Sequence, residues 1–338
     1  MTDIVEATVP LVTVRGLSVE FATQEGTVRA VDDVSFTAGA GEIIGLVGES
    51  ASGKSTLGLS LLRAVPAPGR TSAEELRLED RDLLGLSETE LRTVRSAEIA
   101  LVVQDALATM NPVTTIGEQI TRILRDHAVP GTRREHRERA IRALGEVRLP
   151  DPEDVMRRYP HELSGGMQQR VAIAQGLILE PKLIIADEPT TALDVTVQAQ
   201  ILALLKSIAA THGTSIIFVT HDLATVAEIG DRVMVMYAGR IVESGPVKDV
   251  FRSPEHPYTR ALLASLLPLG GEPPARLDAI PGQPPRPGSW PTGCRFSPRC
   301  PLYRAKGEPE QCRTHDPRAR GDGSHWAACH FATEEESE

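Results

Sequence analysis

The sequence predicts an α/β protein with a largely parallel sheet, a helical insertion, and a small Pro- and Cys-rich module at its C-terminus. Apolar strands alternate with helical patterns along the chain, a glycine-containing loop separates one strand from its helix at 48–55, and helical patterns dominate 88–179. Strand–helix–strand alternation favours parallel strands with helices on both faces of the sheet.

The first 86 residues are predicted to form strands around one helix. Apolar residues alternate from Val12 to Phe21, and a second strand-like stretch covers 28–36. An apolar strand at 43–47 leads into the glycine-containing loop, and a helix is expected from Lys54 to Leu62. Residues 66–86 are rich in Pro, Gly and charge, which predicts loops with short strands.

The second half returns to strands before its composition changes. Strands are expected at 183–186 and 216–220, with a helix at 195–212 between them and a closing hairpin at 233–243. The charged stretch 132–146 predicts a solvated helix. Prolines are dense between 268 and 301, which favours an extended segment there. We expect one large α/β domain over 1–253, with helices inserted at about 88–180, and a separate C-terminal domain over 254–338.

Composition and charge restrict the class of protein. The net charge of −10 argues against sequence-independent nucleic-acid binding, which needs clustered Lys and Arg. Residues 1–9 lack a secretion signal, and no apolar run approaches the roughly 18 residues of a membrane-spanning helix. We therefore expect a cytosolic protein that reaches a membrane only through partners. The acidic residues 334–338 predict a disordered tail.

The loop between the strand at 43–47 and the following helix is predicted to bind nucleotide phosphates. It fits G-x-x-x-x-G-K-[ST], in which backbone N–H groups curl around phosphate oxygens at a helix N-terminus. Lys54 would hold the β- and γ-phosphates, and Ser55 would ligate Mg²⁺. The expected ATP-binding residues are Gly48, Glu49, Ser50, Ala51, Ser52, Gly53, Lys54, Ser55 and Thr56.

Two adjacent carboxylates end the apolar strand at 183–186. Asp187 suits a Mg²⁺ shell, and Glu188 suits positioning and polarising the attacking water. A strand that simply meets solvent would give the same pattern. The phosphate-binding loop upstream favours the functional interpretation.

A second anion-binding corner follows, at which the chain resembles a known family. The segment Leu163, Ser164, Gly165, Gly166, Met167 and Gln168 is similar to the LSGGQ signature of ABC-transporter ATPases, with Met167 where Gln is usual. Ser164 with two glycines at a helix N-terminus also suits a helix cap. The resemblance implies a P-loop NTPase cassette with a mixed sheet, which pairs head to tail so that each signature closes over ATP held by the other subunit.

The resemblance assigns further roles. Gln104 matches the glutamine that touches Mg²⁺ and water, and residues 192–194, with Asp194, match the loop that crosses the dimer interface. His221 matches the switch histidine at the γ-phosphate, although a lone histidine at a strand end is more often structural. Phe21 matches the aromatic that stacks on adenine, and a core position is nearly as good an explanation.

The C-terminal part resembles the peptide/nickel importer ATPases, first in the HPYT segment at 256–259 and then in the cysteine-rich end. Four thiolates suit Zn²⁺ or an iron–sulfur cluster. The closest cysteine pair has five residues between, wider than zinc sites usually have, although His315, His325 and His330 keep a mixed zinc site open. The resemblance favours a 4Fe–4S cluster with a structural or regulatory role, because nothing in the sequence links it to the phosphates. Its ligands would be Cys294, Cys300, Cys312 and Cys329.

Three classes compete. A DNA- or ribosome-acting ABC ATPase usually has two cassettes or a long coiled coil, and a P-loop kinase would lack the signature at 163–168. The preferred class is the ATPase subunit of a peptide or small-solute importer, peripheral to the cytoplasmic face of the membrane. Its implied partners are a related but different ATPase subunit, two permease subunits and an external solute-binding protein, with no nucleic acid. A permease helix is expected to dock near 110–120.

Overall fold

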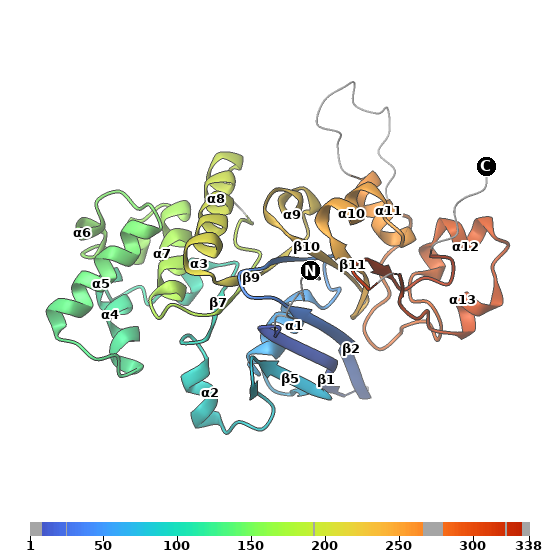
Figure 1. Cartoon of the computed structure of the whole chain (residues 1–338), viewed down its shortest axis with the longest axis horizontal. Helices are drawn as coiled ribbons and strands as arrows, with labels where there is room; N and C mark the ends of the chain where they lie inside the picture. Colours follow the sequence, from blue (N-terminus) through green and yellow to red (C-terminus); the bar gives the residue numbers. More distant parts are fainter. Residues whose placement is uncertain (1–8, 25, 192, 266–279, 322, 333–338) are drawn as a thin grey trace, which may run out of the picture. The chain divides into compact units, whose positions relative to one another are not determined.

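The computed structural model describes residues 9–24, 26–191, 193–265, 280–321 and 323–332 (Figure 1). The predictions for residues 1–8, Ala192, the prolines at 273 and 274, and the acidic tail lie outside these ranges. The chain divides into two compact units: Met1–Leu11, Ala38–Ile43 and Gly85–Val219 form the first, and Val12–Thr37, Ile44–Leu84 and Thr220–Glu338 form the second.

Three parallel strands form the sheet of the first unit. Strand β8 (Leu183–Asp187) lies between β7 (Ile99–Val102) and β9 (Ser215–Thr220), so the strands predicted at 183–186 and 216–220 are confirmed. The first four residues of β8 and all six of β9 are buried. Parallel strands are covered on both faces, which explains why their sequences are continuously apolar.

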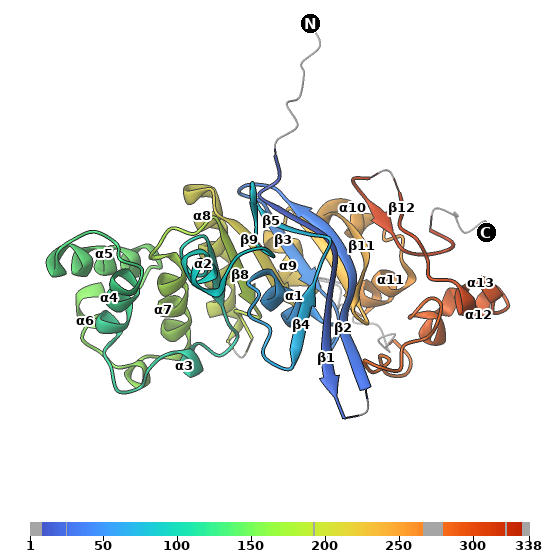
Figure 2. The ribbon, with the colours of Figure 1, turned by 90° about the horizontal axis from the view of Figure 1, so that it is seen from below.

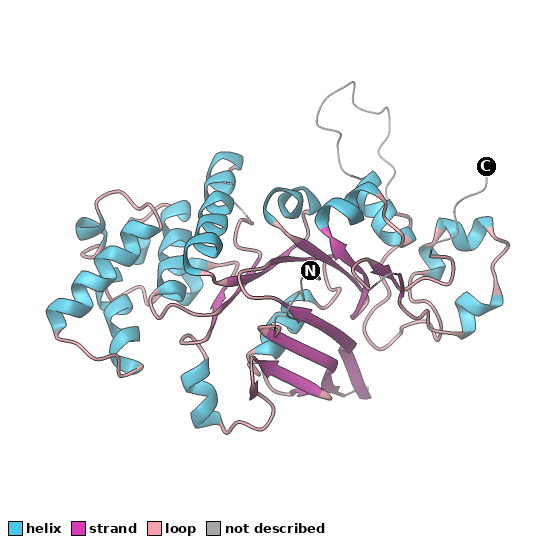
Figure 3. Ribbon diagram, in the orientation of Figure 1, coloured by secondary structure: helices cyan, strands magenta, loops and turns pink. Residues whose placement is uncertain are grey.

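Every element between β7 and β8 is helical (Figure 3). The predicted charged helix is α5, and Thr132 caps it in a capping box with Glu135. The predicted helix 195–212 is α8, capped by Asp194 and ended by Gly213 at φ 66°. The helices of this unit are α2 (Glu88–Val94), α3 (Ala106–Thr109), α4 (Ile116–Asp126), α5 (Arg133–Glu146), α6 (Pro152–Val155), α7 (Gly165–Leu177) and α8 (Val195–His212).

The main sheet of the second unit is mixed. Strand β3 (Ile43–Val47) pairs in parallel with β10 (Arg232–Tyr237), which forms the predicted hairpin with antiparallel β11 (Arg240–Pro246). Two short C-terminal strands, β12 (Arg320–Gly321) and β13 (Trp326–Ala327), extend it beyond β11 in the order β12–β13–β11–β10–β3. This edge of the sheet is antiparallel because a hairpin can only return antiparallel, which confirms the mixed sheet implied by the resemblance.

The N-terminal strands form a second sheet of their own (Figure 2). Its order is β2–β1–β5–β6, with β4 also pairing antiparallel to β1. Burial alternates along β1, as expected for strands with one covered face. The strands are β1 (Val12–Thr23), β2 (Gly26–Ala38), β4 (Gly69–Ser72), β5 (Glu75–Leu78) and β6 (Arg81–Asp82).

The remaining helices belong to the second unit. Helix α1 (Lys54–Leu61) follows the glycine-containing loop as predicted. Between 280 and 300 the described chain holds one short 3-10 turn at Ser297–Arg299 and otherwise no regular element, which agrees with the proline density. The other helices are α9 (Leu223–Ile229), α10 (Val247–Arg252), α11 (Pro257–Ala264), α12 (Pro301–Ala305) and α13 (Glu310–Thr314). Among the described residues, no helix has the length and apolar character needed to cross a bilayer.

Candidate functional site: a phosphate-binding loop and its companions

The loop between β3 and α1 has the conformation that its sequence predicts. Strand β3 is buried throughout, Ala51 lies at φ 61° and Gly53 at φ 107°. Gly53 is the N-cap of α1 and makes no side-chain cap bond. The positive end of the helix therefore opens onto the loop and suits an anion.

Both motif glycines are required by close backbone neighbours. A Cβ at Gly48 would lie 2.1 Å from the Met236 carbonyl oxygen, and one at Gly53 would lie 2.6 Å from the Ala30 carbonyl oxygen. The Gly239 N–H donates to the Ser52 carbonyl at 2.8 Å. The β10–β11 hairpin thus holds the C-terminal half of the loop in place.

Lys54 lies against this loop. It is buried, and its Nζ donates to the carbonyls of Gly48 at 2.8 Å and Glu49 at 3.0 Å. The Ser52 hydroxyl is buried without a hydrogen-bond partner among the described residues. An ammonium and an unsatisfied hydroxyl at the mouth of a helix suit phosphate oxygens.

The two carboxylates at the end of β8 lie in the first unit. Both Asp187 and Glu188 are half-buried. The Glu188 N–H donates to the Val219 carbonyl at 2.9 Å, and its Oε2 accepts from Thr191 Oγ1 at 2.9 Å. Glu188 sits at φ 47°, in the left-handed region that glycine favours. The carboxylate is thus fixed by its neighbours in an unusual backbone conformation.

The predicted signature forms the start of α7. Ser164 is its N-cap, and its hydroxyl accepts from the Met167 N–H at 3.4 Å. A Cβ at Gly166 would meet Val197 Cγ1 at 2.7 Å, whereas one at Gly165 would meet only Leu193 Cδ2 at 3.9 Å. Gly166 therefore serves packing against α8, whereas Gly165 is exposed and has room for a side chain.

The other predicted site residues lie at the ends of elements. Gln104 and His221 are exposed just after β7 and β9, and Phe21 is half-buried near the end of β1. Asp194 caps α8 by accepting from the Val197 N–H at 3.0 Å. Their functional roles stay predictions.

Comparison with known proteins decides the family. The protein-family model described as "ABC transporter" matches residues 31–191. A second family model, "Oligopeptide/dipeptide transporter, C-terminal region", matches residues 242–306. The dipeptide transport ATP-binding protein DppD of Haemophilus influenzae is 45% identical over 96% of this chain and 97% of its own length. The chain belongs to the ABC transporter family. It is an ATP-binding and ATP-hydrolysing cassette.

Two further similarities support the family. The oligopeptide transport ATP-binding protein AppD of Bacillus subtilis is 45% identical over 91% of this ABC ATPase and 92% of its own chain. A solved structure, the dimeric form of the bacterial ABC transporter cassette MJ0796, shares 27% identity over 70% of this chain and 98% of that chain, with a TM-score of 0.60. The P-loop NTPase cassette fold expected from the resemblance is confirmed.

The four cysteines of this ABC ATPase line one small pocket with His330 and Phe331. Burial, and secondarily the neighbouring thiols, raise the pKa of Cys294 to about 12 and that of Cys312 to about 11. The donor set fits a thiolate-bound metal group. However, no three His, Cys, Asp or Glu side chains of the described chain are arranged to hold a metal ion, and neither a cluster nor zinc is supported by the comparisons.

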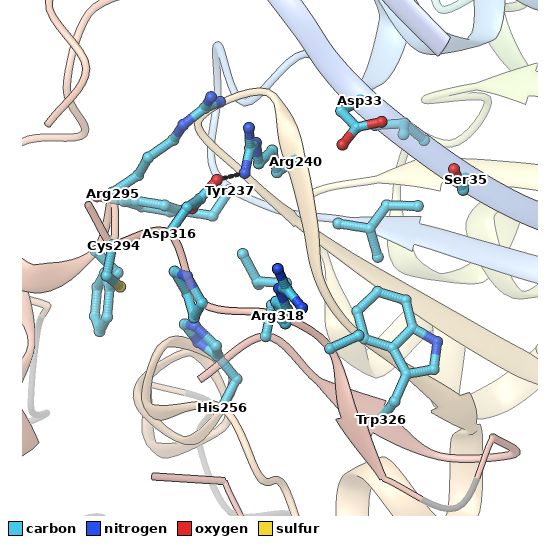
Figure 4. A pocket seen from close by; sticks show the side chains of 17 residues that line it. Asp33, Ser35, Tyr237, Arg240, His256, Cys294, Arg295, Asp316, Arg318 and Trp326 are labelled. Atoms are coloured by element: carbon cyan, nitrogen blue, oxygen red, sulfur yellow. Dashed lines mark ion pairs between the residues drawn. The ribbon is translucent and has the colours of Figure 1, made fainter. Parts of the chain in front are cut away.

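A larger cavity, of about 680 Å³, lies elsewhere in the second unit (Figure 4). It is lined by residues of β2, β10 and β11 together with the segment that carries the four cysteines, 294–329, which we call the cysteine module. No residue of the phosphate-binding loop at 48–55, the P-loop, contributes to it. On one side Arg240 pairs with Asp316, and Asp32 accepts from Arg240 and Arg295. The cavity is therefore not the nucleotide site, and its ion pairs attach the module to the cassette.

Sequence reasoning missed two residues that touch the P-loop. Arg299 of the module pairs with Glu49, and Tyr258 of the HPYT segment accepts from the Glu49 N–H. The expectation that nothing connects the cysteine module to the phosphate site is therefore wrong. No sequence signal could have found Arg299, because the contact spans 250 residues.

Proposed function

We propose that this ABC ATPase powers an importer of di- or oligopeptides, or of related small solutes, at the cytoplasmic face of the cell membrane. The supporting observation is that relatives named for peptide transport align over almost the whole chain. We assign 1–253 to the ATPase domain, with the helical subdomain at about 88–180, and 254–338 to the peptide-importer C-terminal domain.

The proposed ATP site uses the loop and α1 start at 48–56. Lys54 and the loop N–H groups bind the phosphates, and Phe21 stacks on adenine. Ser55, Gln104 and Asp187 would hold Mg²⁺, since these are the oxygen donors that the ion prefers. When bound, Mg²⁺ neutralises charge on the transferring phosphoryl group.

Hydrolysis is assigned to residues of the strand ends. Glu188 accepts a hydrogen bond from the attacking water and thereby orients it. His221 contacts the γ-phosphate. The bond from Thr191 to Glu188 supports this role, because it fixes the orientation of the carboxylate.

The second phosphate-binding corner is proposed to act on the opposite subunit of a dimer. Ser164 and Gly165 would face the ATP of the partner, and Asp194 would cross the interface. Val195, next to Asp194, is 83% exposed, so its apolar side chain is available to a contact surface. We propose that the partner is a related but different ATPase chain.

The permease contact is assigned to the region after Gln104. Leu107 and Val113 are 43% and 77% exposed, so this surface offers apolar side chains to a docking helix. The complete importer would contain two permease subunits and an external solute-binding protein.

Uptake by the assembled transporter tests this function. The chain, co-expressed with its membrane subunits and solute-binding protein, is expected to accumulate a radiolabelled dipeptide in vesicles that contain ATP. Accumulation of a different solute class, with no peptide among a panel of lengths and charges, would contradict the peptide assignment.

Lys54→Ala is expected to weaken ATP binding by about 10- to 100-fold, the value of a charge-assisted hydrogen bond. The affinity is measured with a fluorescent ATP analogue on the full chain. Lys248→Ala, which removes an exposed lysine of α10, is the matched control and should bind normally. Unchanged affinity in Lys54→Ala would overturn the site.

We also propose that Cys294, Cys300, Cys312 and Cys329 bind a 4Fe–4S cluster, with Zn²⁺ as the alternative. Their shared pocket supports this proposal. Protein purified without oxygen is expected to be brown and to contain about four irons per chain, as for Cys-ligated clusters. A Cys300→Ser variant is expected to lose iron, whereas colourless protein with one zinc would establish the alternative.

A further inference from the structure

Glu49, the second residue of the P-loop, is held by an arginine of the cysteine module. Arg299 Nη1 lies 2.7 Å from Glu49 Oε2, and Nη2 lies 3.0 Å from Oε1. The Arg299 side chain is 5% exposed, and its Nε donates to the Pro281 carbonyl at 2.9 Å. Glu49 is 27% exposed, and a bidentate arginine–carboxylate pair with a buried arginine is directional as well as strong.

The backbone of Glu49 is held from the same region. Its N–H donates to the Tyr258 hydroxyl at 2.9 Å. The Tyr258 ring packs against Tyr237 and Phe296, with centroid distances of 4.6 Å and 5.4 Å. Phe296 and Arg299 both belong to the turn that joins Cys294 to Cys300. This turn therefore contributes Phe296 to the aromatic cluster and places the Arg299 guanidinium against the P-loop.

The loop thus has two sets of supports, which meet where Arg299 Nη1 donates to the Tyr237 hydroxyl of β10 at 3.3 Å. The β10–β11 hairpin contacts the loop at its first residue, Gly48, and again at Ser52 and Gly53. Arg299 and Tyr258, both beyond the cassette, hold its N-terminal half through Glu49. Ala51, a non-glycine residue at φ 61°, lies between Glu49 and Ser52, so contacts flank this strained residue on both sides.

We propose that Arg299 is a positioning residue for the P-loop, and that the cysteine turn sets the affinity for ATP by holding Glu49. The proposal rests on the role of the P-loop proposed above. It gives the C-terminal module a direct mechanical route to the nucleotide. Loss of the contact frees Glu49 and lets the phosphate-binding N–H groups spread.

The test compares ATP affinity in single and double variants of the full chain. Arg299→Met and Glu49→Gln are each expected to raise the Kd of a fluorescent ATP analogue about tenfold. The double variant should be no weaker than the worse single one, because both changes break the same contact. Arg304→Met, whose exposed guanidinium donates to the Pro298 carbonyl, is the matched control and should keep parental affinity.

A second variant guards against general misfolding of the module. Tyr258→Phe removes only the hydroxyl that accepts from Glu49 and keeps the aromatic packing, so it should raise the Kd by about 2- to 10-fold. In the assembled transporter, the KM for ATP should rise while kcat at saturating ATP stays within about twofold, because Arg299 is not placed among the reacting groups. The thermal midpoint without nucleotide should stay close to that of Arg304→Met.

The outcomes separate the two proposals. Parental affinity in both Arg299→Met and Tyr258→Phe, or a full hundredfold loss in the double variant, would overturn the positioning role. If Lys54→Ala also keeps parental affinity, the P-loop assignment fails. If Lys54→Ala loses ATP while the Arg299 and Tyr258 variants keep it, only the positioning role fails.

Discussion

Glu188→Gln is expected to bind ATP normally and to lose turnover by about 10²–10³-fold, the usual effect of removing a group that positions the attacking water. Glutamine keeps the size of the side chain and an oxygen that can accept from Thr191, so the local structure should survive. It lacks the negative charge that polarises the water. The measurement is the ATP turnover of the assembled transporter, together with the ATP affinity of the full chain.

The control for this variant exists in the same unit. Glu180 is also a glutamate at positive φ, 56°, and its carboxylate pairs with Arg139 on the surface. Glu180→Gln therefore reproduces the chemical change and the backbone setting without touching the strand end. Normal turnover in Glu180→Gln and near-normal turnover in Glu188→Gln together would remove Glu188 from the mechanism.

Gly165→Asp is expected to reduce hydrolysis by at least about 10²-fold while the isolated chain still binds ATP. A carboxylate at the start of α7 would face the γ-phosphate of the opposite subunit, and like charges about 4 Å apart cost about 4 kcal/mol at an intermediate dielectric. The fold should accept the side chain, since a Cβ at Gly165 makes only an ordinary contact with Leu193. Turnover in the transporter and ATP affinity of the monomer are both measured.

Two alanine variants distinguish charge from packing. Gly165→Ala adds no charge and should have a much smaller effect than Gly165→Asp. Gly166→Ala should instead disturb the packing of α7 against α8, because its Cβ would lie 2.7 Å from Val197 Cγ1. Loss of ATP binding by the Gly165→Asp monomer would mean that the signature acts within its own chain.

The strands and helices that carry the motifs were predictable, because their signals are local. Strand β3, helix α1 and strand β8 follow from apolar runs that end in glycine or carboxylate, and α8 has an aspartate cap and a glycine stop. The second sheet was not separated from the first. Alternation along β1 shows that one face is covered, but it does not identify which strands are the neighbours.

Contacts between distant segments could not be derived. Asp32 in β2 receives bonds from Arg240 and from Arg295, and the latter is 263 residues away. Burial alone would raise the pKa of Asp32, yet the arginines lower it below its usual value. The carboxyl therefore stabilises the fold above its unfolded-state pKa and loses that contribution as the pH falls through the folded-state value. The charge composition of the sequence does not indicate which arginines pair with Asp32.

The backbone conformation at Glu188 sets stability against the retention of its carboxylate. A left-handed conformation at a residue with a Cβ costs about 1–2 kcal/mol, and glycine or asparagine would relieve it. Selection for thermostability alone would therefore favour replacing this glutamate. An engineering programme that ranks variants by melting temperature alone would reward loss of the carboxylate, so position 188 has to be held constant in any such library.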